Sequence, residues 1–105
     1  MSHAMVTFAE IEEARRRCGD AIKVTPLRPS ESLSKTVGAN VSLKLENHQH
    51  TGSFKSRGAL NRLLTLDDEA KKNGVVAASA GNHAQGVAYH AQRLGIRSTI
   101  VMPLG

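Results

Sequence analysis

The sequence predicts an α/β fold with a parallel sheet, and three consecutive segments carry this prediction. Val75–Ser79 is a continuous run of small apolar residues, which is typical of a buried strand in a parallel sheet. A helical pattern follows over about Asn82–Leu94 and stops at Gly95, and a second strand follows over Ser98–Pro103. Strand, helix and strand form a βαβ unit, for which a right-handed crossover is expected.

The first predicted element is a helix near the N-terminus. Thr7 and Glu10 have the spacing of a capping box, so the helix should start directly after Thr7. Its apolar positions recur on one side and are expected to face the core: Phe8, Ile11, Cys18 and Ile22. Cys18 is therefore interpreted as a small core residue and not as a nucleophile.

The next segment is predicted to contain a connector, a short helix and a strand. Pro26 and Pro29 indicate the connector, and Ser30 can cap a helix that continues through Leu33–Gly38. Val41–Leu45 alternates apolar and polar residues, which predicts a half-buried strand.

A polar loop, Glu46–Gly52, then leads into a helix expected over about Ser53–Leu66. The apolar residues of this helix approximate one stripe: Phe54, Leu60, Leu63 and Leu64. In "LDDEAKKNG" acidic residues precede lysines and Gly74 ends the run, so a short helix is expected there. The later helix should bury Ala84, Val87, Ala88, Ala91 and Leu94.

Composition argues against several classes of protein. The net charge is +5, but aromatic residues make up only 3% of the chain, so platforms for stacking bases are nearly absent and no nucleic-acid partner is expected. The Arg15–Arg17 run is best explained as a solvated helix face. No apolar run approaches bilayer length, and no membrane partner is expected. One cysteine and no signal-peptide pattern favour a cytoplasmic location.

Lys55 stands where a helix is predicted to begin, just after Ser53, a good N-cap residue. The first turn of a helix carries partial positive charge, so a lysine there is mildly unfavourable, and broken local rules often mark functional sites. Lysine amines attack carbonyl groups where burial or nearby positive charge activates them, and Arg57 could supply such charge. Lys55 can equally be an exposed lysine without a role, and Arg57 a solvated or structural residue. Phe54 is either a core residue or a ring that packs on a flat cofactor.

A second loop, "SAGNHAQG" over Ser79–Gly86, joins a strand to a helix at the edge of the sheet where α/β proteins bind ligands. Helix N-terminal amides and polar side chains there could bind an anion such as a carboxylate. Gly81 and Gly86 have Walker A spacing, but Val87 and Ala88 follow where Lys and Ser or Thr are required. The dinucleotide-binding pattern fails as well. Histidine spacings give no metal motif, and no metal is expected.

Two motifs together resemble a known family. "KLENHQHTGSFKSRGA" (Lys44–Ala59) and "VVAASAGNHAQGVAYHAQRLGIRSTIVMP" (Val75–Pro103) closely resemble the threonine/serine dehydratases. These are pyridoxal-phosphate enzymes of fold type II, the tryptophan-synthase-β-like fold. The resemblance implies a three-layer αβα architecture with a parallel sheet, of which this chain would hold an incomplete, N-terminal part. It assigns residues 1–49 to the large cofactor domain and residues 50–105 to a partial small domain.

The resemblance also implies residue roles. Lys55 matches the lysine that holds pyridoxal phosphate as a Schiff base, and Phe54 matches an aromatic residue that packs near the cofactor ring. Asn82 matches the asparagine that hydrogen-bonds the ring hydroxyl. The loop that binds the substrate carboxylate corresponds to Ser79, Ala80, Gly81, Asn82 and His83.

The implied reaction is the dehydration and deamination of L-threonine or L-serine to a 2-oxo acid and ammonia, with Lys55 as covalent anchor and general base. Serine racemases of this family tend to carry a serine where this chain has Ala80, and alanine cannot transfer a proton. Dehydration is therefore favoured over a serine or aspartate racemase. A non-catalytic module that binds a small anion or a partner is the alternative from another class.

The family is longer than this chain, and its glycine-rich phosphate loop has no counterpart here. The chain alone is therefore expected to be inactive, and the complete enzyme to be a homo-oligomer, either a dimer or a tetramer.

Overall fold

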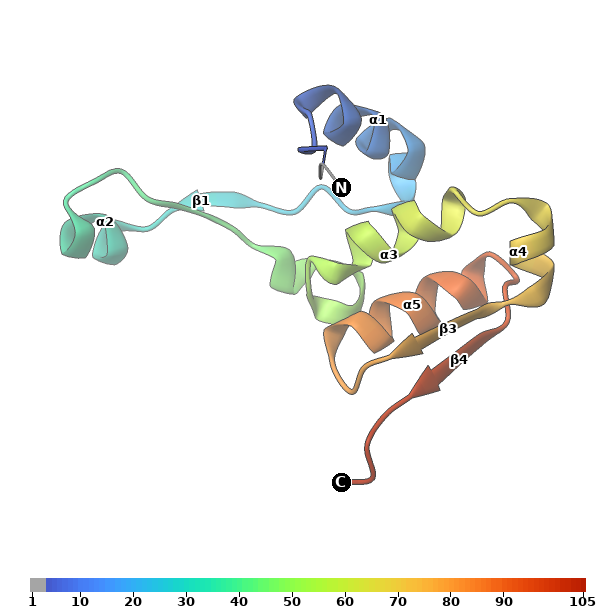
Figure 1. Ribbon diagram of the computed structural model, residues 1–105. Helices are drawn as coiled ribbons and strands as arrows, with labels where there is room; N and C mark the ends of the chain where they lie inside the picture. The colour runs from blue at the N-terminus through green and yellow to red at the C-terminus, as the bar shows by residue number, and fades with distance from the viewer. Residues whose placement is uncertain (1–3) are drawn as a thin grey trace.

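The computed structural model describes residues 4–105 (Figure 1). His3, for which the sequence suggests a polar surface or satisfied core position, lies outside these residues. The helices are α1 (Phe8–Cys18), α2 (Glu31–Val37), α3 (Lys55–Leu64), α4 (Asp68–Asn73) and α5 (Asn82–Arg93). The strands are β1 (Leu27–Pro29), β2 (Ser42–Lys44), β3 (Val75–Ala78) and β4 (Ser98–Val101). Short 3₁₀ turns occur at Gly19–Ala21, Glu46–His48 and His50–Gly52.

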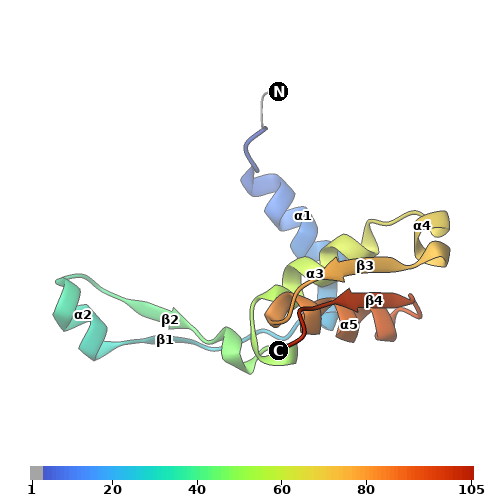
Figure 2. The same cartoon turned by 60° about the horizontal axis from the view of Figure 1, so that its bottom comes forward.

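Strands β3 and β4 pair in parallel, with Val75 opposite Ser98 and Ala78 opposite Val101, and α5 connects them. The predicted βαβ unit is therefore confirmed. The expectation that β3 is fully buried is wrong, because burial alternates along the strand and Val76 is 74% exposed. In Figures 1 and 2, α5 lies along one face of this two-stranded sheet and no described element covers the other face.

Strands β1 and β2 form an antiparallel arm that carries α2 at its tip and projects away from the other elements (Figures 1 and 2). The connector predicted around Pro29 is thus a strand, in which Pro29 pairs with Ser42. Proline lacks an N–H donor, and a two-stranded ribbon tolerates it because both strands are edges. The half-burial expected for Val41–Leu45 is confirmed for Val41 and Leu45, whereas Leu43, in β2 itself, is 41% exposed because no layer covers the arm there.

Local capping signals are confirmed. The Thr7 hydroxyl accepts a hydrogen bond from the Glu10 amide at 3.3 Å, and the Glu10 carboxylate accepts from the Thr7 amide at 2.7 Å. Ser30 caps α2 and Gly38 ends it in the left-handed region at φ 69°. The helix predicted in "LDDEAKKNG" is α4, which Asp67 caps through the Ala70 amide at 2.7 Å.

Helix α1 forms as predicted, but its expected core face is wrong. Phe8 is 74% exposed and Ile11 is 56% exposed, whereas Ile22 is buried and Cys18 is half-buried. Helix α1 packs mainly against α3, and the exposure of Phe8 and Ile11 shows that its first turns have little apolar surface to contact.

The core lies where α3 and α5 pack together and meet the sheet. Leu63, Ala91 and Ile96 form its buried centre, and Leu66 and Val75 pack against it. The predicted stripe of α3 is confirmed for Leu60 and Leu63, whereas Phe54 is 63% exposed and Leu64 is half-buried.

The buried face of α5 differs from the predicted one at its margins. Ala84, Val87 and Ala91 are buried as expected, but Ala88 and Leu94 are exposed. Gly86 and His90 are buried in their place. The face of α5 that meets α3 therefore includes a glycine and a polar residue, which a search for apolar periodicity does not count.

Gly86 allows close contact between the two helices. A β-carbon at this position would lie 3.2 Å from the Lys55 carbonyl oxygen and 3.3 Å from the Ala59 β-carbon. Both neighbours belong to the body of α3 and cannot move independently of it. The glycine thus holds the backbone of Lys55 directly against the second turn of α5.

We expect Gly86→Ala to destabilise the fold by about 1 kcal/mol, because overpacking costs about 1–3 kcal/mol and outweighs the gain of about 0.5–1 kcal/mol from replacing glycine inside a helix. Gly58→Ala in α3 is the matched control, since no atom lies within 4 Å of its added β-carbon. That variant should raise the free energy of unfolding by about 0.5–1 kcal/mol. Urea unfolding measures both, and equal effects of the two substitutions would contradict the close contact at Gly86.

Candidate functional site

Lys55 is the first residue of α3, and its side chain is exposed. The Ser53 hydroxyl accepts a hydrogen bond from the Lys55 amide at 3.3 Å. The N-cap position of α3 is nevertheless Phe54, which makes no side-chain cap, so the N-cap role predicted for Ser53 is wrong. The lysine nitrogen lies 5.8 Å from the centre of the Phe54 ring. Phe54 thus belongs to the surroundings of the lysine and not to the core.

The second predicted loop joins β3 to α5. The Ser79 hydroxyl accepts hydrogen bonds from the amides of Gly81 at 3.2 Å and Ala84 at 3.3 Å, and so caps α5 from a distance. The amides of Asn82 and His83 have no hydrogen-bond partner among residues 4–105. Two free donors at a helix N-terminus are suited to bind an anion.

The packing of α5 on α3 brings the two loops to one end of the structure. Asn82, Gly86 and His90 are spaced four residues apart, so they follow one side of α5. Gly86 meets the Lys55 backbone and His90 meets Ser56, the next residue. Asn82 lies one turn before these contacts on the same side. Figure 1 shows α3 and α5 beginning at this same end.

Arg57 is a structural residue. Its guanidinium makes a bidentate ion pair with Glu46, with Nε to Oε2 and a terminal nitrogen to Oε1 both at 2.8 Å. The Glu46 carboxylate also accepts from the Thr25 hydroxyl at 2.6 Å. The hydrogen bond from Arg57 is the main cause that lowers the pKa of Glu46 from 4.5 to about 2. Because its charge is paired, Arg57 is poorly placed to activate Lys55.

Gln49 extends this network along the loop. Its side chain is buried and makes two hydrogen bonds with the backbone of Lys23, accepting from the amide at 3.0 Å and donating to the carbonyl at 2.9 Å. Together with Glu46 it joins the segment before β1 to the loop that precedes Lys55. The loop Glu46–Gly52 is thereby fixed at its N-terminal end by these hydrogen bonds, and at its C-terminal end it continues into α3.

Backbone strain occurs four residues before Lys55. Thr51 has φ 63° and is followed by Gly52 at φ 75°. A β-branched residue in the left-handed region is an outlier, and such strain tends to cluster at functional sites. The Thr51 hydroxyl is also buried without a hydrogen-bond partner in the part of the chain that the structure describes.

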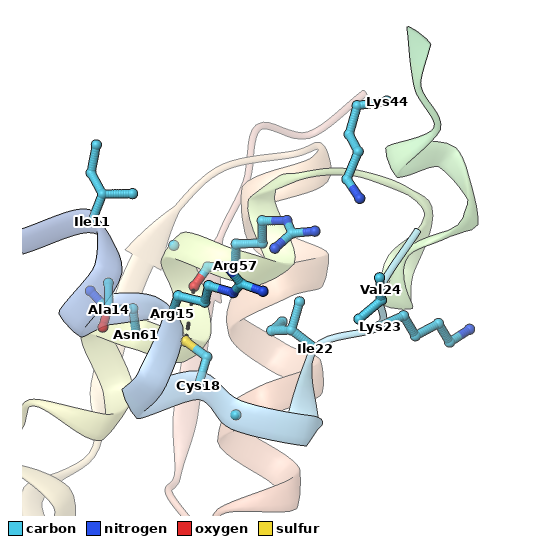
Figure 3. A pocket seen from close by; sticks show the side chains of 12 residues that line it. Ile11, Ala14, Arg15, Cys18, Ile22, Lys23, Val24, Lys44, Arg57 and Asn61 are labelled. Atoms are coloured by element: carbon cyan, nitrogen blue, oxygen red, sulfur yellow. Dashed lines mark hydrogen bonds between the residues drawn. The ribbon is translucent and has the colours of Figure 1, made fainter. Parts of the chain in front are cut away.

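A pocket of about 610 Å³ lies between α1, the start of the β1–β2 arm and α3 (Figure 3). Its lining is apolar at Ile11 and Ile22 and cationic at Arg15 and Lys23. The pocket is separate from the candidate site, because none of the predicted site residues lines it. The Cys18 sulfur lies 3.9 Å from the Arg57 carbonyl oxygen at its edge, and burial raises the pKa of this thiol.

The sequence did not single out Glu46, Ser56 or His90 for the contacts they make. Each is paired with a residue at least 11 positions away in the chain, so no local spacing reveals the contact. Across residues 4–105 the structure contains no group of three or more metal-ligating side chains. Within the same residues no helix is both long and apolar enough to cross a bilayer.

Comparison with known proteins gives consistent matches. The family model described as "Pyridoxal-phosphate dependent enzyme" matches residues 19–105. An L-threonine ammonia-lyase of Thermotoga maritima is 54% identical over 99 residues, which cover 94% of this chain and 25% of that protein. The catabolic L-threonine dehydratase TdcB of Staphylococcus aureus is 55% identical over 100 residues, which cover 94% of this chain and 29% of that protein.

Solved structures agree with this match. Serine racemase from Dictyostelium discoideum superposes with a TM-score of 0.88 at 38% identity, covering 95% of this chain and 33% of that one. The predicted incomplete α/β fold of type II is therefore confirmed. The chain spans between 25% and 29% of the length of the two curated relatives named above.

We expect Glu46→Gln to lower the free energy of unfolding by about 1–3 kcal/mol at neutral pH, since it removes a charged acceptor of several hydrogen bonds. Folding lowers the pKa of Glu46 from 4.5 to about 2, so the carboxylate stabilises the fold fully above the higher value and loses this effect as the pH falls to the lower one. Urea unfolding should therefore show the difference between wild type and variant shrinking over this pH range.

Glu13→Gln is the control for this prediction. Glu13 pairs with Arg17 at 2.8 Å within α1, but the carboxylate side chain is 63% exposed. Exposed pairs within a helix contribute about 0.3–0.5 kcal/mol. An effect of Glu46→Gln as small as that of Glu13→Gln would contradict a structural role for the Glu46–Arg57 pair.

Proposed function

The chain belongs to the family of pyridoxal-phosphate-dependent enzymes, and on this premise we propose that it acts as part of an L-threonine dehydratase. Curated relatives named as L-threonine ammonia-lyase and dehydratase, 54% and 55% identical over 94% of the chain, support this choice of reaction. The observation that carries the proposal is the close packing of the Lys55 backbone, at the start of α3, against Gly86 in the second turn of α5, the helix whose first turn carries the free amides.

The residues at this end of the structure fit an aldehyde cofactor with a flat ring. Within residues 4–105 the Lys55 amine makes no hydrogen bond or ion pair, so it is available to react. The exposed ring of Phe54 lies beside it. Lys55 would hold pyridoxal phosphate covalently, Phe54 would pack near its ring, and Asn82 would hydrogen-bond the ring hydroxyl. When bound, this cofactor supplies an electron sink for the electron pair left by breaking a Cα–H bond.

The protein groups then have separable tasks. The Asn82 and His83 amides, with the loop from Ser79 to Gly81, would bind the substrate carboxylate and fix the amino acid in one orientation. Once the substrate amine had taken its place on the cofactor, the freed Lys55 amine would remove the Cα proton as a general base. The β-hydroxyl would leave with a proton as water, and one water molecule would then be consumed as ammonia is released. For L-threonine the products are 2-oxobutanoate and ammonia.

Racemisation is the second candidate, because a serine racemase superposes closely on this chain. A racemase needs a proton donor on the face of the substrate opposite the lysine. Ala80 carries only a methyl group, which transfers no proton, and it lies in the same loop as the free amides. This residue favours dehydration.

We predict that borohydride reduction of the protein as its gene encodes it, in the presence of pyridoxal phosphate, followed by peptide mass mapping, finds the pyridoxyl group on Lys55. Lys55→Ala should abolish this adduct and lower dehydratase activity by about 10²–10⁴-fold or more, because it removes both the anchor and the base. Lys72→Ala, which removes an exposed lysine of α4, should change neither. An unmodified Lys55 in the folded protein would refute the proposed enzyme.

We expect Ala80→Ser to raise the ratio of serine racemisation to elimination by about tenfold or more, since positioned acid–base groups contribute about 10²–10⁴-fold to proton transfer. Chiral chromatography of the residual serine, alongside a coupled assay for pyruvate, measures the two rates. The control is Ala78→Ser, which makes the same change at an exposed position at the end of β3. An unchanged ratio in Ala80→Ser would show that this residue does not choose between the reactions.

A further inference from the structure

Ser56 and His90 form a buried polar pair directly behind Lys55. Ser56 is 0% exposed and His90 is 1% exposed, and the Ser56 hydroxyl oxygen lies 2.6 Å from the His90 Nε2 atom. The two residues are 34 positions apart and belong to α3 and α5 respectively. A side-chain hydrogen bond thus joins the helix that carries Lys55 to the helix whose N-terminus holds the free amides.

Burial makes this bond specific. An unpaired polar group in the protein interior raises the free energy of the folded state. The Ser56 and His90 side chains therefore strongly favour the arrangement in which they hydrogen-bond to each other. The groups that face His90 are Ser56 from α3, His50 from the preceding loop, and Tyr89 and Arg93 from α5 itself. Burial lowers the pKa of His90, and the nearby His50 and Arg93 lower it further. The neutral ring is the form that pairs with Ser56.

Two contacts at consecutive residues define the first turn of α3. Gly86 brings the Lys55 backbone into close contact with α5, which sets how near the helices approach. That contact involves no directional bond and by itself does not set the rotation of the first turn of α3, which Arg57 of the same turn also restrains through its pair with Glu46. The Ser56–His90 hydrogen bond is directional, and it sets the rotation. The direction of the Lys55 side chain follows from that rotation, because Lys55 and Ser56 share one helical turn.

We propose that Ser56 and His90 are positioning residues for Lys55. From the side of α3 that meets α5, they orient the Lys55 side chain toward the cofactor and substrate. This inference rests on the proposed function, in which Lys55 is the cofactor anchor. Ser56 does not contact the substrate, because it is fully buried on the side of α3 that meets α5. Its effect on the reaction passes through the orientation of Lys55 alone.

The test uses the protein as its gene encodes it, with pyridoxal phosphate as the probe. The rate at which borohydride traps the cofactor on Lys55 is measured by mass mapping under conditions where each variant keeps the helical signal of the wild type. Ser56→Ala and His90→Leu should slow trapping by about tenfold, because a misplaced reactive group loses up to about 10²-fold. His90→Gln retains a hydrogen-bonding group near Nε2 and should restore most of the rate.

Thr65→Ala is the matched control. It also removes a hydroxyl, which donates to the Arg62 carbonyl at 2.8 Å, but it lies at the far end of α3. Trapping in this variant should equal that of the wild type. Hydrogen exchange at the amides of the first turn of α3 should accelerate in Ser56→Ala and not in Thr65→Ala. If Ser56→Ala does not fold, the comparison of His90→Leu with His90→Gln makes the same test.

The outcomes separate this inference from the proposed function. Wild-type protein that does not trap the cofactor at Lys55 would overturn both. Wild-type trapping with an unchanged rate in folded Ser56→Ala and His90→Leu would overturn the positioning role alone. Equal slowing in Thr65→Ala would also overturn it, because the effect would then reflect the general stability of α3. Slowing in both pair variants with recovery in His90→Gln would establish the role.

Discussion

The close packing of α5 on α3 at Gly86 is the contact on which the candidate site depends. With no side chain between the two helices, the backbone of Lys55 lies directly against α5. Asn82 lies one turn before Gly86 on α5, at the end of the structure where α3 begins with Lys55. His90 lies one turn after Gly86, where it forms the buried pair with Ser56. A single small residue thereby sets the spacing between the proposed anchor and the proposed anion-binding loop. The core residues between α3, α5 and the sheet, centred on Leu63, Ala91 and Ile96, stabilise this packing.

Among residues 4–105, Lys55 has no ion-pair partner, whereas the nearby Arg57 is paired with Glu46. Arg57, two residues after Lys55, is neutralised by Glu46, and the same carboxylate holds the segment before β1 through Thr25. This network stabilises the loop that leads into α3 without placing an acid beside the lysine. Three local rules are broken near this point: a cation stands at a helix start, Thr51 has positive φ, and the Thr51 hydroxyl is buried without a partner in the described structure. Concentrated irregularity of this kind is what a functional site is expected to show.

Much apolar surface remains open outside the core. Val76 on the outer face of the sheet and Phe8 on α1 are each 74% exposed. The sequence pattern at both positions correctly indicates residues suited to burial, and a parallel strand such as β3 normally has both faces covered. The predictions of burial were wrong there because burial requires a second surface, and residues 4–105 supply one for only one face of the sheet and one side of α1. An apolar sequence pattern indicates that a side chain prefers burial, but it does not show whether the chain supplies a surface to cover that side chain.

The amino-acid sequence by itself determined the helices, their caps and the βαβ order, because these depend on residues three or four positions apart. The capping box at Thr7, the cap of α2 by Ser30 and its end at Gly38 are all of this kind. The motifs around Lys55 and Asn82 also sufficed to indicate the family. Only the tertiary structure decided that Arg57 pairs with Glu46, that Ser56 meets His90, and that a glycine brings the two loops together. These contacts join residues 11 to 34 positions apart, and their free energy depends on packing geometry that no local pattern encodes.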